Sequence, residues 1–240
     1  EQQDFNLLSR APLLHPSIPM SFVMSAGLEQ VETSLTNARK RSGDKFILVQ
    51  DCFRHFDIEV VGKGDFHLSF FEMPGAFIFG RNGRQIAINH MWTLLTELMG
   101  IQPDRIWVSY FGGGKLGNHD LPEDGLTYQA WKNIGVSHDR LVRLGIHHNY
   151  WIQGTGLQNN GTSPHARKCG PTTELFYDLG EDRSCGPDCN PGCRCGRFIE
   201  FSNSLFISHH LDPETNSLAP MDDPFTETVI GTERVAVILQ

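Results

Sequence analysis

The sequence predicts an α+β fold in which an antiparallel sheet is backed by helices. Runs rich in β-branched and aromatic residues follow one another along the chain, few of them alternate with a helix, and one long segment has helical periodicity. The 240 residues are enough to bury a core, and a composition of 39% hydrophobic and 20% charged residues is typical of a soluble globular protein. We therefore expect a single domain over residues 1–240.

The first predicted elements are two strands and a helix. Lys45–Arg54 (KFILVQDCFR) is apolar and β-branched, and Phe66–Phe79 is rich in aromatic residues, with Pro74-Gly75 as an internal bend or bulge. Asn82-Gly83 then marks a turn. A helix is predicted over Arg84–Met99, because apolar residues recur there at helical spacing and a glycine follows in the position that ends a helix.

The later elements are shorter and are predicted from the same signals. In chain order they are a strand over Arg105–Phe111, surface helices over Glu123–Ile134 and His138–Leu144, a polar loop over Gln153–Arg167, strands over Thr173–Asp178 and Arg197–Ser208, and a terminal helix over Gly231–Gln240. The polar loop is long enough to be functional or mobile. Because few strand–helix–strand units occur, the sheet is predicted to be antiparallel.

Net charge and hydropathy narrow the classes of function. The net charge of −8 argues against a broad basic surface, so any nucleic acid would have to meet a local patch. No apolar run approaches the length of a membrane span, and the N-terminal residues lack the layout of an export signal. We therefore expect a cytoplasmic protein with reduced thiols and no membrane partner.

Four cysteines lie within eleven residues, at Cys185, Cys189, Cys193 and Cys195. Glycines and prolines between them predict a tight loop, and four thiolates from such a loop suit a tetrahedral Zn²⁺ ion. We call residues 185–195 the cysteine knuckle. Local disulfides, or free thiols on a loop, are the alternative. A set of four cysteine ligands leaves no open position for a substrate, so the ion is expected to be structural.

Three short patterns indicate a nucleotide site. Arg54 and His67 stand at facing ends of a predicted hairpin, where they can hold phosphate oxygens, and Phe71 offers a face for a base. Gly231–Arg234 (GTER) combines close backbone approach with a guanidinium that can stack on a ring or pair with phosphate. Alternate side chains of Glu200–Asn203 (EFSN) can reach metal-bound phosphate and substrate. Each pattern alone is more often ordinary surface structure.

Together, and in this order, these segments resemble the catalytic domain of alanyl-tRNA synthetases, a family of class II aminoacyl-tRNA synthetases. The similar segments are Met24–Leu28 (MSAGL, against TNAGM), Cys52–Arg54 (CFR, against CIRA), His67–Gly75 (HLSFFEMPG, against HHTFFEMLG), Asn149–Trp151 (NYW, against DNFW), Cys169–Asp178 (CGPTTELFYD, against CGPCSEIHYD), Glu200–Phe206 (EFSNSLF, against EIWNLVF) and Thr228–Gln240 (TVIGTERVAVILQ, against TGMGLERLAAVLQ). The resemblance implies a class II synthetase-like antiparallel sheet flanked by helices. The cysteine knuckle, expected from its own residues to hold zinc with four cysteine ligands, is then a small insertion between two strands of that sheet.

The resemblance also implies an ATP site that forms an aminoacyl-adenylate. Arg54 would contact the α-phosphate and His67 the β- and γ-phosphates. Phe71 and Arg234 would cover the two faces of adenine. The other implied ATP-binding residues are Glu72, Met73 and Gly231. Catalysis would rest on Arg54, His67 and Arg234, with Mg²⁺ neutralising the leaving group, so that positioning and electrostatics carry the reaction.

An amino-acid pocket is implied beside the ATP site. Trp151 and Asn203 would line it, and Glu227 stands where the family has an aspartate that binds the substrate ammonium. Here the sequence departs from the family, because Glu227 is one methylene longer and Val229 replaces a glycine. Ser202 replaces a tryptophan and is expected to open space elsewhere. The pocket is thus predicted to be reshaped for a small amino acid that need not be alanine.

Three functions follow from these observations, and one is favoured. It is ATP-dependent activation of a small amino acid by a stand-alone, truncated paralogue that transfers the acyl group to a carrier-protein thiol or a small-molecule amine. The loop between Arg54 and His67 is shorter than in the family, no helical or editing domain follows Gln240, and the chain is acidic, all of which disfavour tRNA.

The alternatives are a catalytic fragment of an alanyl-tRNA synthetase that charges tRNA, and a non-catalytic paralogue that binds a nucleotide or an amino acid. The residues implied to bind ATP are all present, which disfavours a non-catalytic role.

Overall fold

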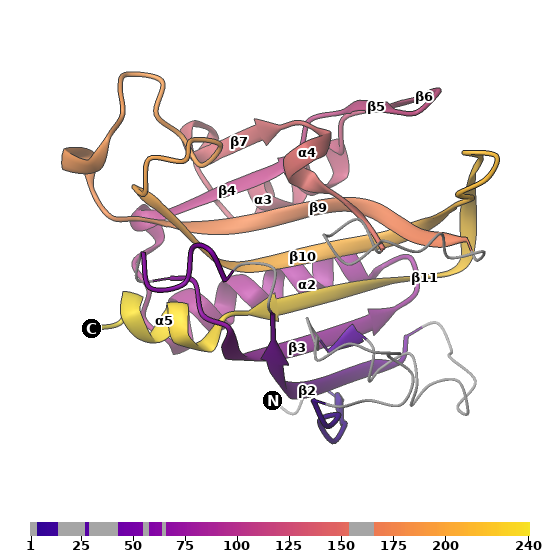
Figure 1. The fold of residues 1–240 in the computed structure, drawn as a ribbon, viewed down its shortest axis with the longest axis horizontal. Helices are drawn as coiled ribbons and strands as arrows, with labels where there is room; N and C mark the ends of the chain where they lie inside the picture. The colour runs from indigo at the N-terminus through magenta and orange to yellow at the C-terminus, as the bar shows by residue number, and fades with distance from the viewer. Residues whose placement is uncertain (1–3, 14–26, 29–42, 55–57, 64–65, 154–165) are drawn as a thin grey trace.

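In the computed structural model, a large twisted sheet runs through the molecule and helices α2 and α3 lie behind it (Figure 1). The structure describes residues 4–13, 27–28, 43–54, 58–63, 66–153 and 166–240. The strand order is β1-β2-β3-β11-β10-β9-β4-β7, with β8 paired to β9. These strands are β1 (Asn6–Leu7), β2 (Lys45–Phe53), β3 (Phe70–Phe79), β4 (Ile106–Phe111), β7 (Leu141–Leu144), β8 (Tyr150–Ile152), β9 (Arg167–Asp178), β10 (Phe198–Leu211) and β11 (Leu218–Ile230).

The sheet is mainly antiparallel, as predicted. Only the outer pairs β1–β2 and β4–β7 are parallel among the described strands. A separate two-stranded ribbon is formed by β5 (Gly114–Leu116) and β6 (His119–Leu121). All five strands that the sequence predicts are present, and β9 and β10 are longer than predicted because they continue to the far end of their shared ladder.

The helices are short apart from the one with the clearest periodicity. That helix, predicted over Arg84–Met99, is α2 (Gly83–Thr93) continued by the π-helical turn η1 (Leu94–Leu98). Gly100 ends it with a φ of 76°, a left-handed conformation that favours glycine. The others are α3 (Gly125–Asn133), α4 (Ile146–Asn149), α5 (Thr232–Ile238) and the 3-10 turns η2 (Pro103–Arg105), η3 (His138–Arg140) and η4 (Glu181–Arg183).

The predicted surface helix over His138–Leu144 is wrong. Residues 138–140 form one 3-10 turn, and residues 141–144 form β7, which pairs in parallel with β4. Leu141 is buried in the main hydrophobic cluster while Arg143 is exposed. Pairing with β4 and burial of Leu141 therefore outweigh the local helical pattern.

Strand β11 was not anticipated, although it lies in the middle of the sheet between β3 and β10. Its sequence, LAPMDDPFTETVI, carries two prolines and three acidic residues, which are uncommon in central strands. Both prolines lie in its first half, and the second half is buried continuously from Phe225 to Ile230. This half pairs with β3 and β10 and supplies two of the predicted site residues.

Alternate side chains of the sheet serve two hydrophobic clusters on opposite faces. On one face, Ile88, Met91 and Leu95 of α2 and η1 pack with residues such as Phe206 and Ile230. On the other face, Phe77 and Phe79 of β3 pack with Ile207 and Phe225. The second face is the one toward the viewer in Figure 1 and carries the candidate site.

Two of the sequence segments discussed above fall largely outside the described residues. They are residues 24–26 of the segment similar to TNAGM and residues 154–165 of the polar loop. Among the described residues, no helix has both the length and the hydropathy needed to cross a membrane.

Candidate functional site

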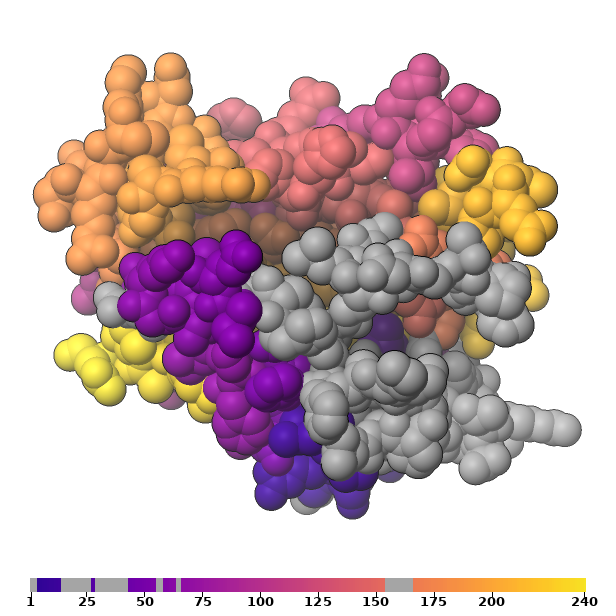
Figure 2. Space-filling model, in the orientation of Figure 1, coloured from indigo at the N-terminus to yellow at the C-terminus, as the bar shows by residue number. Residues whose placement is uncertain are grey.

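A cavity of about 190 Å³ opens at one end of the sheet, and it gathers most of the predicted site residues. We call it the central cavity. Those predicted from sequence are Arg54, His67, Phe71, Met73, Asn203, Val229, Gly231 and Arg234. They come from the ends of β2, β3, β10 and β11 and from the start of α5. Figure 2 shows the segment that includes residues 66–68 in front of the sheet, between the cysteine knuckle and α5.

Arg54 and Phe71 are in direct contact at the edge of the central cavity. The Arg54 guanidinium lies over the Phe71 ring, with Cζ 4.9 Å from the ring centroid. Cys52 pairs with Phe71 across the β2–β3 ladder, so Arg54 continues from the strand opposite the aromatic residue. His67 is exposed and lines the same cavity. The hairpin thus brings together the cation, the imidazole and the aromatic face, as the sequence predicts.

Arg234 is held over the cavity by strand β10. Its Nη1 donates to the Glu200 carbonyl oxygen at 2.6 Å and lies 3.6 Å from a Glu200 carboxylate oxygen. Its Nε donates to the Phe66 carbonyl oxygen at 3.3 Å. Gly231 precedes it, and the Gly231 N–H donates to the Phe201 carbonyl oxygen at 3.0 Å, which fixes the start of α5 beside β10.

Glu72 lies next to the central cavity but does not line it. Its backbone N–H donates to the Glu233 carboxylate at 2.9 Å, and its own carboxylate accepts from the Thr232 hydroxyl at 3.3 Å. These bonds tie β3 to the first turn of α5. Glu72 therefore connects the two elements that carry Phe71 and Arg234.

The predicted amino-acid pocket is only partly assembled around the cavity. Asn203 and Val229 are paired neighbours on β10 and β11 and line it. Glu227 pairs with Leu205 one step further along the same face and is buried, with 2% of its surface exposed. Trp151 on β8 packs against the cluster that contains Phe77. Glu227 and Trp151 are therefore not among the residues that line the cavity.

Ser202 lines the cavity, but its hydroxyl group makes contacts away from it. The Ser202 hydroxyl points to the opposite face, where it lies 3.0 Å from Met91 Sδ and donates to the Val229 carbonyl oxygen at 2.8 Å. Because side chains alternate along a strand, Asn203 faces the cavity and Ser202 faces α2. The Ser202 hydroxyl therefore packs against α2, while Ser202, Asn203 and Val229 all line the cavity.

A polar row beside the cavity was not identified from the sequence. Ser109, Glu174 and Asn203 are consecutive partners across β4, β9 and β10. Ser109 Oγ donates to Glu174 at 3.4 Å, and Asn149 Nδ2 donates to Ser109 Oγ at 2.9 Å. Asn203 Nδ2 donates to the Glu200 carboxylate at 3.1 Å. Strand pairing creates the row, so no single sequence motif indicates it.

Glu174 is unlike an ordinary surface carboxyl. Burial raises its pKa well above the usual 4.5, and the nearby Glu200 carboxylate raises it further, whereas the hydrogen bond from Ser109 opposes the rise. A carboxyl with a raised pKa binds its proton more tightly in the folded state. Its contribution to stability is therefore complete below its unfolded pKa and is lost as the pH rises through the folded pKa.

Glu174→Gln is expected to remove this pH dependence. The free energy of unfolding of the wild type, measured in urea from pH 4.5 to pH 8, should fall steadily relative to that of the variant as the pH rises. Glu97→Gln is the control, since Glu97 is exposed on η1. A difference between wild type and Glu174→Gln that stays constant across this range would contradict the assignment.

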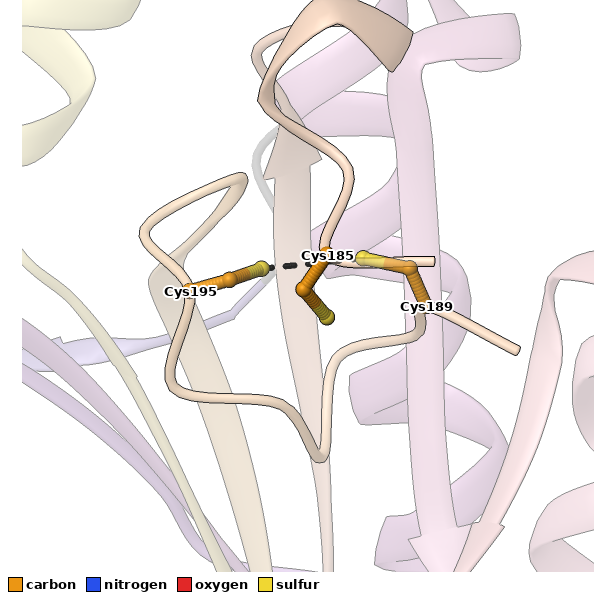
Figure 3. A group of neighbouring side chains, drawn as sticks. All are labelled: Cys185, Cys189 and Cys195. Atoms are coloured by element: carbon orange, nitrogen blue, oxygen red, sulfur yellow. Dashed lines mark hydrogen bonds between the residues drawn. The ribbon is translucent and has the colours of Figure 1, made fainter. Parts of the chain in front are cut away.

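The cysteine knuckle lies between β9 and β10, where the sequence predicts it. The sulfur atoms of Cys185, Cys189 and Cys195 lie within 4.8 Å of one another and point toward a common centre (Figure 3). Cys193 is outside this mutual group but is hydrogen-bonded to Cys185. All six cysteines of the chain are free thiols, and Cys52 and Cys169 are buried far from the knuckle in sequence.

The thiols of the cysteine knuckle influence one another. A backbone hydrogen bond from Cys185 and bonds from neighbouring groups lower the pKa of Cys189 to about 6. Hydrogen bonds with the other thiols raise the pKa of Cys185 to about 12. Soft sulfur donors at this density fit a Zn²⁺ ion, which prefers four such ligands.

Asp178 and Arg197 lie on either side of the cysteine knuckle, at the end of β9 and just before β10. They form a two-bond ion pair, with Arg197 Nε and Nη2 donating to the carboxylate at 2.8 and 2.7 Å. Burial opposes ionisation of Asp178, but the bonds from Arg197 and from the Gly180 N–H outweigh it and lower its pKa. The hydrogen bond to Asp178 raises the pKa of Arg197 in turn.

Comparison with known proteins gives a consistent result. The family model for tRNA synthetases class II (A) matches residues 1–240. An alanine–tRNA ligase of Pelotomaculum thermopropionicum is 34% identical over 242 residues, covering 100% of this chain and 25% of the relative. An alanine–tRNA ligase of a Thermoanaerobacter species is 34% identical over 220 residues, covering 91% and 23%.

Among solved structures, apo histidyl-tRNA synthetase of S. aureus is 9% identical, with a TM-score of 0.44 over 90% of this chain and 50% of that one. The chain thus spans about a quarter of the length of the curated relatives it matches.

Proposed function

The chain belongs to the class II (A) tRNA synthetase family, and from that premise we propose that it activates a small amino acid with ATP. A carboxylate oxygen of the amino acid attacks the α-phosphorus, the bond from that phosphorus to the bridging oxygen breaks, and pyrophosphate leaves. The product is the aminoacyl-adenylate. The observation that carries the proposal is the convergence of Arg54, His67, Phe71 and Arg234 on one cavity.

The chemistry needs positioning and charge rather than a nucleophilic side chain. In this proposal Arg54 neutralises the α-phosphate during attack and His67 binds the outer phosphates. Phe71 and Arg234 enclose adenine, and Glu200 aligns the Arg234 guanidinium through its carbonyl oxygen. Met73 and Gly231 complete the base site within the cavity, and Glu72 supports it from β3.

The cavity also offers oxygen donors that fit Mg²⁺. Glu200 and Asn203 line the cavity, and the buried Asn203 Oδ1 accepts no hydrogen bond from the described residues. Glu174 is the β9 partner of Asn203 and lies beside the cavity. Hard cations prefer such oxygen ligands. When bound there, Mg²⁺ neutralises charge on the phosphates and on the leaving pyrophosphate. Glu200 would then have two roles, since its carbonyl oxygen orients Arg234 and its carboxylate would help to hold the metal.

The amino-acid end is proposed to lie over Asn203 and Val229. Val229 reaches toward Gly75, and its isopropyl group occupies space that a glycine would leave open. Glu227 is the proposed partner of the substrate ammonium, with Trp151 behind it. Glu227 and Trp151 do not line the cavity. They can contact the amino acid only if the substrate extends beyond the cavity along the β10–β11 face. A short side chain on the substrate fits this arrangement best.

For the acceptor, we propose tRNA. The relatives named above are alanine–tRNA ligases, and a carrier-protein thiol or a small amine has no such support. The sequence-based preference for a non-tRNA acceptor rested on the short loop between Arg54 and His67, on the acidic charge, and on the lack of further domains in the given sequence. Since the chain spans about a quarter of its relatives, its length is no argument on this point.

Amino-acid-dependent exchange of labelled pyrophosphate into ATP tests the proposal. The assay is run with each of the standard amino acids in turn, and exchange is expected with one or a few small ones. No exchange with any amino acid would leave a non-catalytic binding protein as the better interpretation. Transfer is then measured separately, with tRNA, a carrier protein or a small amine offered to the preformed adenylate.

We further propose that the cysteine knuckle binds one Zn²⁺ ion in a structural role, in a cytoplasmic setting that keeps its thiols reduced. Removing the ion with a chelator is expected to lower the melting temperature by several degrees, because the loop loses the cross-link that holds it together. Differential scanning fluorimetry measures this shift, and atomic emission gives the zinc content. Cys52→Ser is the control, since Cys52 lies outside the knuckle and should leave zinc content unchanged.

A further inference from the structure

One side chain, Arg197, joins the cysteine knuckle to the sheet. Its guanidinium is hydrogen-bonded to the Cys189 side chain and holds the Asp178 carboxylate by two bonds. Its backbone carbonyl oxygen accepts from the Leu179 N–H at 2.9 Å. Arg197 is 8% exposed, so these contacts are largely shielded from water. Arg197 therefore links the cysteine knuckle to the end of β9 and the start of β10.

The contacts continue from Arg197 to the ATP site within one strand. Phe198 pairs with Asp178, and Glu200 pairs with Phe176 on β9. The register then shifts between Glu200 and Ser202, and such a bulge re-aims side chains next to it. Glu200 in turn binds Arg234 through its carbonyl oxygen and Asn203 through its carboxylate. The alignment of Arg234 thus depends on the first three residues of β10.

We propose that Arg197 is a positioning residue through which metal at the cysteine knuckle controls ATP binding. Metal ligation by Cys189 fixes the contact of that residue with Arg197. Arg197 then holds Asp178 and the start of β10, and Glu200 keeps Arg234 over the cavity. Without the metal, the loop moves and this alignment is lost. The inference rests on the proposed function in two points, the identification of the nucleotide as ATP and the Zn²⁺ ion at the cysteine knuckle.

If the cysteine knuckle only stabilises the fold, removal of its metal should have a different effect. Its removal would lower the melting temperature but leave Arg234 and Glu200 in place in the protein that remains folded. The two roles separate in hydrogen–deuterium exchange, which reports local opening of backbone amides independently of activity. Control through Arg197 predicts faster exchange in two distant segments, residues 198–203 and residues 231–236. A purely stabilising loop predicts faster exchange within residues 181–197 alone.

The test compares the zinc-loaded chain, the chelated chain and Arg197→Gln. Arg194→Gln is the matched control, because Arg194 is an exposed arginine of the same loop. Arg197→Gln should retain zinc, weaken ATP binding in calorimetry by about fivefold, and speed exchange at residues 231–236. Chelation should weaken ATP binding similarly in the wild type and add little in Arg197→Gln, as expected when both changes break one coupled contact.

Several results would overturn the inference. They are unchanged exchange at residues 231–236 in both altered forms, fully additive effects of chelation and Arg197→Gln, and a chain that binds no metal when purified with zinc. If the chelated chain unfolds, Arg197→Gln carries the test alone through its ATP affinity and its exchange pattern. Failure of the proposed function appears separately, as an absence of pyrophosphate exchange in the zinc-loaded wild type.

Discussion

Replacing Arg54 with alanine is expected to lower amino-acid-dependent pyrophosphate exchange by about a hundredfold or more. Removal of one preorganised group that stabilises developing charge typically costs about a hundredfold to a thousandfold in rate. Arg54 lines the central cavity, and its guanidinium rests on Phe71, so the substitution removes both a charge and one wall of the proposed base site. The measurement is the initial rate of exchange at saturating ATP and amino acid.

Two controls separate this effect from unfolding and from loss of charge alone. Arg81→Ala removes an exposed arginine at the other end of β3 and should leave exchange nearly unchanged. Arg54→Lys keeps the charge but loses the planar donor geometry, and it should recover only part of the activity. Wild-type exchange in a folded Arg54→Ala variant, judged by circular dichroism, would mean that the ATP site lies elsewhere.

Replacing Trp131 with alanine is expected to destabilise the fold by about 3–5 kcal/mol, the usual cost of truncating a fully buried aromatic residue. Trp131 on α3 is completely buried and packs edge-on against Trp92 of α2, with ring centroids 6.0 Å apart. Its indole N–H also donates to the Thr173 hydroxyl at 2.9 Å on β9. The side chain therefore joins two helices to the sheet.

Urea unfolding followed by circular dichroism measures this loss. Trp131→Phe keeps much of the volume but not the hydrogen bond, and its destabilisation should be clearly smaller. Trp107→Phe is a second control, because Trp107 is only partly buried on β4. Equal destabilisation by Trp131→Ala and Trp131→Phe would show that the hydrogen bond to Thr173, rather than packing, accounts for the effect.

Residues near one another in sequence were the easiest to place from sequence alone. The hairpin that brings Arg54 beside Phe71, the helix at Arg84–Met99 and the cysteine knuckle are all formed by short segments with strong local signals. Spacing was sufficient for the knuckle because all four cysteines lie in one loop. Local chemistry and local structure agree in these cases.

Features that depend on which strands become neighbours were not predictable in this way. Glu174 meets Ser109 and Asn203 only because β9 pairs with both β4 and β10, and nothing near Glu174 in sequence indicates a raised pKa. The Ser202 hydroxyl points toward α2 because side chains alternate along β10 after the bulge between Glu200 and Ser202. The position of that bulge could not be predicted from the sequence. The family resemblance supplied candidate residues, and the sheet decided which of them line the cavity.

The central position of β11 has a consequence for synthesis of the protein. The half of the candidate site on β2 and β3 is translated well before the half on β11 and α5, yet Gly75 on β3 pairs with Val229 on β11. Until β11 arrives, the nascent chain presents β3 with an unpaired edge, and exposed edges of this kind promote association between chains. The candidate site therefore cannot be completed until β11 has been translated, and the β3 edge stays available to other chains until then.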